Sequence, residues 1–87
     1  MIAEEEGYKK VRFIPNRGLC GLKRFAFTTG LVIGLDEIGY EGRYCFANNS
    51  DAEKSFAEWN GEGDPSGDWI KYKGQGGERS NPKLLKI

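Results

Sequence analysis

The chain contains no histidine among its 87 residues. Histidine is the usual general base near neutral pH and the commonest metal ligand in proteins. Its absence excludes Ser-His-Asp and Cys-His catalytic sites and every zinc site that uses an imidazole. Two cysteines, Cys20 and Cys45, are too few for a four-thiolate zinc site within one chain. We therefore expect no catalytic residue, no cofactor, no metal site and no enzymatic activity.

Long apolar runs are also missing. No stretch approaches the roughly 20 apolar residues that a membrane-spanning helix needs. The first six residues, MIAEEE, are acidic and do not have the basic and apolar regions of a secretory signal. We expect a cytoplasmic protein that contacts no membrane, in which Cys20 and Cys45 are free thiols.

The chain has no net charge, because 13 basic residues balance 13 acidic ones. A neutral domain is not the usual composition of a protein that binds the phosphate backbone of nucleic acids. The two signs are nevertheless separated along the chain. Charged residues are all basic from 7 to 35, mostly acidic from 36 to 68, and mostly basic from 71 onward. These segments either form separate faces that orient a charged partner, or interleave and cancel.

The length of the chain suits one core, and its aromatic content of 13% supplies large apolar side chains for that core. We expect a flexible acidic lead over residues 1–8 and a single domain over residues 9–87. The oligomeric state does not follow from the sequence.

Alternating apolar and polar residues predict a small antiparallel meander of about 4–5 strands. Phe25 and Phe27 fall on one face of the second strand, and a turn at Thr29-Gly30 follows it. Asp36–Gly39 suits a type I hairpin turn closed by a left-handed glycine. The predicted strands are Lys10–Ile14, Leu22–Thr28, Leu31–Asp36, Gly39–Ala47 and Trp69–Lys73, with loops that include residues 16–21 and 74–82.

One helix is predicted over residues 50–60. Ser50 and Glu53 have the spacing of a capping box. An apolar stripe follows at helical spacing, formed by Ala52, Phe56 and Trp59. The predicted fold class is therefore α+β, an antiparallel meander packed by this one helix.

Two short patterns near the end of the chain allow more than one interpretation. The run Lys73–Gly77 has the glycines of a phosphate-binding loop but lacks its Lys-Ser/Thr pair, which favours a mobile turn. The preceding residues alternate aromatic and basic side chains, as in proteins that hold single-stranded nucleic acid. The same pattern suits a strand with its rings in the core and its lysines in solvent. These residues are Trp69, Lys71, Tyr72 and Lys73.

The lack of catalytic groups and the acidic segment favour a non-enzymatic protein-binding domain of an accessory or inhibitor-like kind. Small chains of this kind are typical of phages and other mobile elements. The sequence does not identify the protein partner. We expect its contacts to include Glu37, Glu41 and Asp64.

The alternative is a nucleic-acid-binding domain that uses basic residues of the sheet and of the C-terminal segment. In this hypothesis four cations lie on one face, and binding weakens steeply with salt. The candidate contacts are Lys23, Arg24, Lys71 and Lys73.

Overall fold

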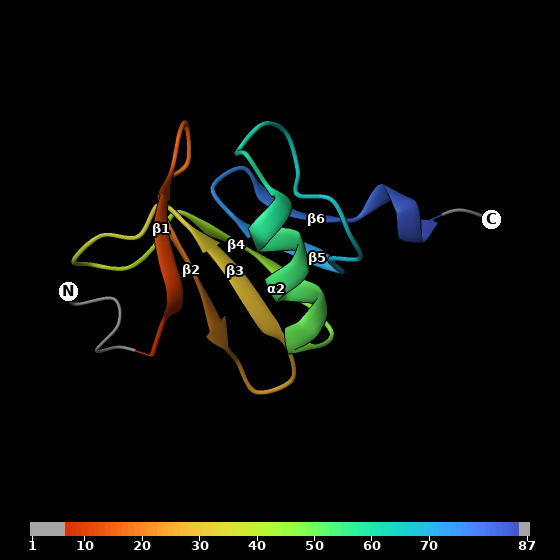
Figure 1. Cartoon of the computed structure of the whole chain (residues 1–87). Helices are drawn as coiled ribbons and strands as arrows, with labels where there is room; N and C mark the ends of the chain where they lie inside the picture. Colours follow the sequence, from red (N-terminus) through yellow and green to blue (C-terminus); the bar gives the residue numbers. More distant parts are fainter. Residues whose placement is uncertain (1–6, 86–87) are drawn as a thin grey trace.

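The computed structural model of the chain describes residues 7–85. Six strands form one antiparallel sheet in which neighbours along the chain are also neighbours in the sheet (Figure 1). Helix α2 (Asn49–Glu58) lies across one face of this sheet, and a short 3-10 helix, η1 (Pro82–Leu85), follows the last strand. The strands are β1 (Lys9–Ile14), β2 (Gly18–Arg24), β3 (Thr29–Ile33), β4 (Gly42–Phe46), β5 (Lys71–Gly74) and β6 (Gly77–Ser80).

The predicted α+β meander is confirmed, with one strand more than expected. None of the helices within residues 7–85 is long and apolar enough to span a membrane. Cys20 and Cys45 are both buried and unpaired. Most of the predicted acidic lead, residues 1–6, lies outside the described part of the chain.

Strand β2 begins and ends earlier than the sequence predicted. Residues 18–21, which were expected to be a loop, belong to the strand, and residues 25–28 form the turn that follows it. The Phe25 amide donates to the Thr28 carbonyl at 2.8 Å and closes this turn. The sequence analysis interpreted the glycines as loop residues, but Gly21 is a strand residue that a neighbouring side chain approaches closely. A Cβ at Gly21 would lie 3.1 Å from Cγ2 of Val11. The predicted strand Leu22–Thr28 is therefore correct only over residues 22–24, and the predicted turn at Thr29-Gly30 was wrong, because both of its residues belong to β3.

The β3–β4 hairpin was predicted correctly in kind but its strands are shorter. β3 ends at Ile33 and β4 begins at Gly42, so an eight-residue loop (34–41) joins them. The turn at its tip is held by Asp36, whose Oδ1 accepts from the amides of Ile38 and Gly39, both at 2.8 Å. Gly39 is not among the glycines with positive φ. The side chain of Asp36 therefore stabilises the turn, in place of the left-handed glycine that was predicted.

The predicted loop over residues 74–82 contains a strand, β6. Gln75 and Gly76 make a tight connection from β5, and Gly76 and Gly77 have φ of 88° and 93°. Glycines adopt such angles at little cost, which makes them the usual residues of short hairpins. The glycine-rich run therefore forms a hairpin rather than a mobile loop.

The N-cap of helix α2 lies two residues before the predicted one. Asn48 is the N-cap: its Oδ1 accepts from the Asp51 amide at 2.8 Å, and its Nδ2 donates to Oδ2 of Asp51 at 3.0 Å. Asparagine caps helices as well as serine does, and Asn48 caps this helix in place of the predicted Ser50. The predicted partner Glu53 instead accepts from Nδ2 of Asn49 at 2.8 Å.

The core lies between α2 and the sheet, and Tyr44 is at its centre. Strand register brings Leu22, Leu31, Tyr44 and Tyr72 into one row that faces the helix. The ring of Tyr44 meets three other aromatic rings at centroid distances of 4.8 to 5.7 Å, those of Trp59, Trp69 and Tyr72.

Two arginines attach β1 and the β1–β2 turn to the end of the helix. Arg12 donates to the carbonyls of Phe56 and Trp59, the second at 3.0 Å, and its guanidinium lies over the Phe56 ring. Arg17 donates to the carbonyls of Gly61 at 2.9 Å and Gly63 at 2.7 Å. Arg12 therefore bonds to carbonyls at the end of α2, and Arg17 to carbonyls of the loop that follows it, so both arginines fix this end of the helix.

We expect Gly42→Ala to lower the free energy of unfolding by about 1–3 kcal/mol, because a Cβ there overpacks the core. That Cβ would lie 2.3 Å from Oη and 2.7 Å from Cζ of the buried Tyr72. Gly39→Ala is the control, since a Cβ at Gly39 meets nothing within 4 Å. Chemical denaturation measures both variants, and equal stability of the two would contradict the proposed contact.

Candidate binding surface

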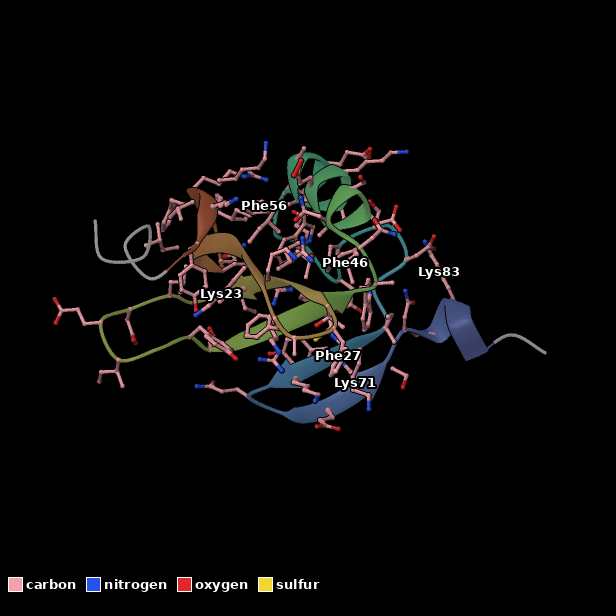
Figure 2. The ribbon with its side chains drawn as sticks, turned by 90° about the horizontal axis from the view of Figure 1, so that it is seen from below. Lys23, Phe27, Phe46, Phe56, Lys71 and Lys83 are labelled. Carbon is pink, nitrogen blue, oxygen red and sulfur yellow. The ribbon has the colours of Figure 1, made fainter. Side chains whose placement is uncertain are left out.

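The face of the sheet opposite to α2 has no second layer of secondary structure over it within residues 7–85. Figure 2 shows Phe56 of the helix on one side of the sheet and Lys71 on the other. We call this uncovered side the open face. Because side chains alternate between the two faces of a strand, the register defines its residues. From β2 to β6 they are Gly21, Lys23, Gly30, Val32, Arg43, Cys45, Lys71, Lys73, Glu78 and Ser80.

Cations dominate the charged side chains among these residues. Four of them are basic and one, Glu78, is acidic. Its carboxylate lies 3.8 Å from Nζ of Lys71 and 3.9 Å from Nζ of Lys73, and all three side chains are about half exposed. Exposed ion pairs of this kind contribute little to stability, so the lysines remain accessible to an anionic ligand.

A small apolar cluster fills the β1–β3 end of the open face. Tyr8 and Val32 are buried there, and Val11, Phe25 and Leu35 pack against them. Tyr8 therefore belongs to a packed cluster, although it was expected to lie in a flexible lead. The ring of Phe25 lies directly on Gly30, where a Cβ would approach its Cε2 to 2.5 Å.

Arg43 is held in place beside this cluster. Its guanidinium carbon lies 4.1 Å from the centroid of the Phe25 ring, and its Nη1 donates to the Tyr40 hydroxyl at 2.8 Å. Its Nε is buried and has no hydrogen-bond partner among the described residues. The contacts with Phe25 and Tyr40 thus fix the position of a cation beside the cluster.

A shallow hollow of about 360 Å³ lies where the β2–β3 turn meets β4 and β5. Phe27, which was predicted to share one face of a strand with Phe25, is 94% exposed at this turn. Figure 2 shows Phe27 and Lys71 next to each other on the open side. Three cations and no carboxylate line the hollow, which is formed by Phe25, Ala26, Phe27, Thr28, Arg43, Cys45, Ile70, Lys71 and Lys73.

The structure brings together three of the four predicted nucleic-acid contacts. Lys23, Lys71 and Lys73 lie on the open face, whereas Arg24 pairs with the buried Thr29 and points to the side of the helix. Sequence reasoning missed two residues of the hollow. Arg43 alternates with the core residue Tyr44, which is a signal for the outer face, but Phe27 could be found only by placing the turn correctly.

The predicted protein contacts do not form one patch. Glu37 and Glu41 belong to the β3–β4 loop, and Asp64 lies in the loop after α2; these two loops project from different sides of the molecule (Figure 1). Asp64 also has internal partners. It accepts from the Tyr44 hydroxyl at 2.9 Å and forms a two-pronged ion pair with Arg79.

This network shifts the pKa of both acidic groups. The hydrogen bond from Arg79 lowers the pKa of Asp64 below its usual range, against the opposing effect of burial. Burial, with the neighbouring Asp64, raises the pKa of Tyr44 to about 12. The neutral phenol therefore donates to a charged carboxylate throughout the physiological pH range.

The described residues offer little reactive chemistry. Cys20 is buried, and that burial raises the pKa of its thiol, which keeps it protonated and a poor nucleophile. No group of three or more His, Cys, Asp or Glu side chains within residues 7–85 is arranged to hold a metal ion. No protein-family model, curated protein or solved structure matches the chain.

We expect Asp64→Asn to lower the free energy of unfolding at pH 7 by roughly 1–2 kcal/mol, a value reduced by the partial exposure of this ion pair. Because the pKa of Asp64 is lowered in the folded state, the stabilisation is complete above the unfolded value near 4 and disappears as the pH falls through the folded one. The difference from wild type should therefore shrink toward pH 2.

Urea denaturation at pH 7 and at pH 2 measures this effect. Asp68→Asn is the matched control, because Asp68 is an exposed carboxylate in the same loop and its side chain has no ion-pair partner among the described residues. A loss that is equal at both pH values would show that the ion pair with Arg79 is not its cause.

Proposed function

We propose that the protein is a non-enzymatic domain that binds single-stranded nucleic acid on the open face. The observation that carries this proposal is the hollow in which the exposed ring of Phe27 lies beside Arg43, Lys71 and Lys73. Proteins that bind single strands stack bases on aromatic rings and place cations along the phosphates. The hollow offers both groups within one lining.

A single strand suits this surface better than a duplex. Reading a duplex by its base edges requires an element that enters a groove, usually a helix. Here α2 packs on the opposite face, and its inner side is occupied by Ala52, Ser55 and Phe56. A sheet that presents an exposed ring is instead suited to bases that are already unstacked.

The zero net charge of the chain does not weigh against this function. The local field at a surface depends on which charges are near it. Arg12, Arg17 and Arg79 form internal contacts on the helix side, and the carboxylate of Asp64 is there as well. The lysines and Arg43 of the open face keep a local excess of positive charge.

We expect Phe27→Ala to weaken binding of a fluorescent dT12 oligonucleotide by roughly 5- to 100-fold, the loss typical of one stacked base. The substitution removes a 94% exposed side chain, so the fold should be unchanged. Phe13→Ala is the matched control, because Phe13 is 69% exposed at the opposite end of β2, across from Leu19. Fluorescence anisotropy at low salt measures both variants.

The proposal fails if the wild-type protein shows no association with dT12 or with the corresponding RNA at low salt. It also fails if Phe27→Ala binds as tightly as Phe13→Ala. Affinity that does not fall with added salt would exclude phosphate contacts by the lysines.

A second candidate function, a contact with a protein partner, is favoured by the tip of the β3–β4 loop. Ile38 is 98% exposed there. The amides of Ile38 and Gly39 donate to the side chain of Asp36, and these bonds fix the turn that carries Ile38. Glu37 and Glu41 are exposed in the same loop. An isoleucine presented among carboxylates suits a protein surface that is apolar with a basic rim, as an accessory or inhibitor-like protein would bind.

We expect Ile38→Asp to abolish stoichiometric capture of such a protein from the native host and Glu37→Lys to weaken it, since one removes the apolar contact and the other reverses a rim charge. Phe27→Ala is the control and should leave capture unchanged, because it alters the other surface. Affinity purification with mass spectrometry provides the measurement. Identical profiles for wild type and Ile38→Asp would count against this second function.

A further inference from the structure

A second basic hollow lies near the end of β2 and is separate from the hollow on the open face. It has a volume of about 230 Å³ and lies between the start of β1, the end of β2 and the beginning of α2. We call it the basic end. Among the described residues its lining has four cations and one carboxylate, and consists of Gly7, Lys9, Lys10, Leu22, Lys23, Arg24, Asn49 and Glu53.

The charges of the basic end are available to a ligand. Among the described residues, Lys9, Lys10 and Arg24 have no ion-pair partner, and all three are exposed. The carboxylate in the lining, Glu53, already accepts from Nδ2 of Asn49 at 2.8 Å. Within residues 7–85, an anion that enters this hollow would therefore meet three cations that have no ion-pair partner.

The backbone of β1 is irregular at this point. Its register with β2 shifts between Lys9 and Arg12, and Lys10 has a φ of 57°. A left-handed conformation costs a residue other than glycine of the order of 1 kcal/mol or more, and bulges of this kind often redirect a side chain at a functional site. Here the bulge places Lys10 in the lining of the basic end and of an adjoining hollow beside Phe56.

The two hollows meet at the β2–β3 turn. Lys23 and Arg24 line the basic end, and the next residue, Phe25, lines the hollow on the open face. Nζ of Lys23 lies 6.0 Å from the centroid of the Phe25 ring, and the guanidinium of Arg43 lies 4.1 Å from the same centroid. Positive charge thus continues from one hollow to the other.

We infer that one nucleic-acid strand occupies both hollows, with its phosphates reaching the basic end after passing the β2–β3 turn. This inference rests on the proposed function and adds the path of the ligand and a second phosphate-binding site. The basic residues along this path would be Lys9, Lys10, Lys23 and Arg24 at one end and Arg43, Lys71 and Lys73 at the other. A longer strand should then bind more tightly than a short one, because only the longer strand reaches both groups.

The test compares dT4 with dT12 on wild type and on a Lys9→Gln, Arg24→Gln double variant. Each phosphate contact with a single strand contributes about −0.7 to the slope of log K against log salt. Losing two contacts should make the dT12 slope shallower by about 1.4 and weaken dT12 binding by about 25-fold at 0.1 M salt. Binding of dT4 at the Phe27 hollow should not change.

The matched control is a Lys54→Gln, Lys83→Gln double variant, which removes two exposed lysines that do not line either hollow. It should bind both oligonucleotides as wild type does, and circular dichroism checks that all proteins are folded. Equal affinities for dT4 and dT12, or no loss in the Lys9, Arg24 variant, would overturn the inference and leave the proposed function standing.

Two other outcomes would decide whether the proposed function holds and which kind of ligand binds. If neither oligonucleotide binds to wild type at low salt, the proposed function itself fails. If a 12-residue polyglutamate displaces dT12 at equal concentration, the basic surface would be assigned to an acidic protein segment, and the inference of a nucleic-acid path would be wrong.

Discussion

Helix α2 covers only one face of the sheet, and this constraint places the main core on that face and leaves the other face open. A ten-residue helix is about 15 Å long, whereas six strands at about 4.8 Å spacing span roughly 24 Å. The aromatic rings around Tyr44 fill the space that the helix can cover. The open face has only the small cluster around Val32 for apolar packing, so charged side chains occupy much of the rest.

Three of the arginines have a structural role, whereas Arg24 and Arg43 line the hollows together with the lysines. Arg12 and Arg17 donate to carbonyls at and beyond the end of α2, and Arg79 pairs with Asp64. A guanidinium has several donors in a planar group, which suits it to such fixed contacts. The lysines instead lie at the rims of the hollows, where a flexible ammonium can follow a phosphate. Part of the positive charge of the chain therefore stabilises the fold, and the lysines of the hollows are a part that a ligand could contact.

Much of the fold could be predicted from the sequence because it depends on periodicity. The stripe of Ala52, Phe56 and Trp59 specified the helix, and alternation around Tyr44 specified β4. Elements that depend on single glycines could not be placed, because a glycine signals a turn and a close approach equally well. Gly21 and Gly30 lie under Val11 and Phe25, and both were assigned to loops or turns.

The candidate site was harder to predict for a related reason. Its key ring, Phe27, belongs to a turn whose position depended on those glycines, and the internal role of Asp64 depends on a partner 15 residues away, Arg79. No local sequence pattern marks the position of Phe27 or the pairing of Asp64 with Arg79. By contrast, Lys71 and Lys73 follow from simple alternation, which is why they were placed correctly on one face.

The two candidate surfaces are separated by the length of β3. The strand leaves the β2–β3 turn at Thr29 and reaches the β3–β4 loop after Ile33, five residues that span about 13 Å. Substitutions more than about 7–10 Å apart without shared partners usually act independently. The two surfaces are nevertheless linked, because Arg43 of the hollow donates to the hydroxyl of Tyr40 in the β3–β4 loop at 2.8 Å. A nucleic-acid strand on the open face and a protein at Ile38 would still contact different residues. The domain could bind a nucleic acid and a protein at once, and β3 would fix the distance between the two surfaces.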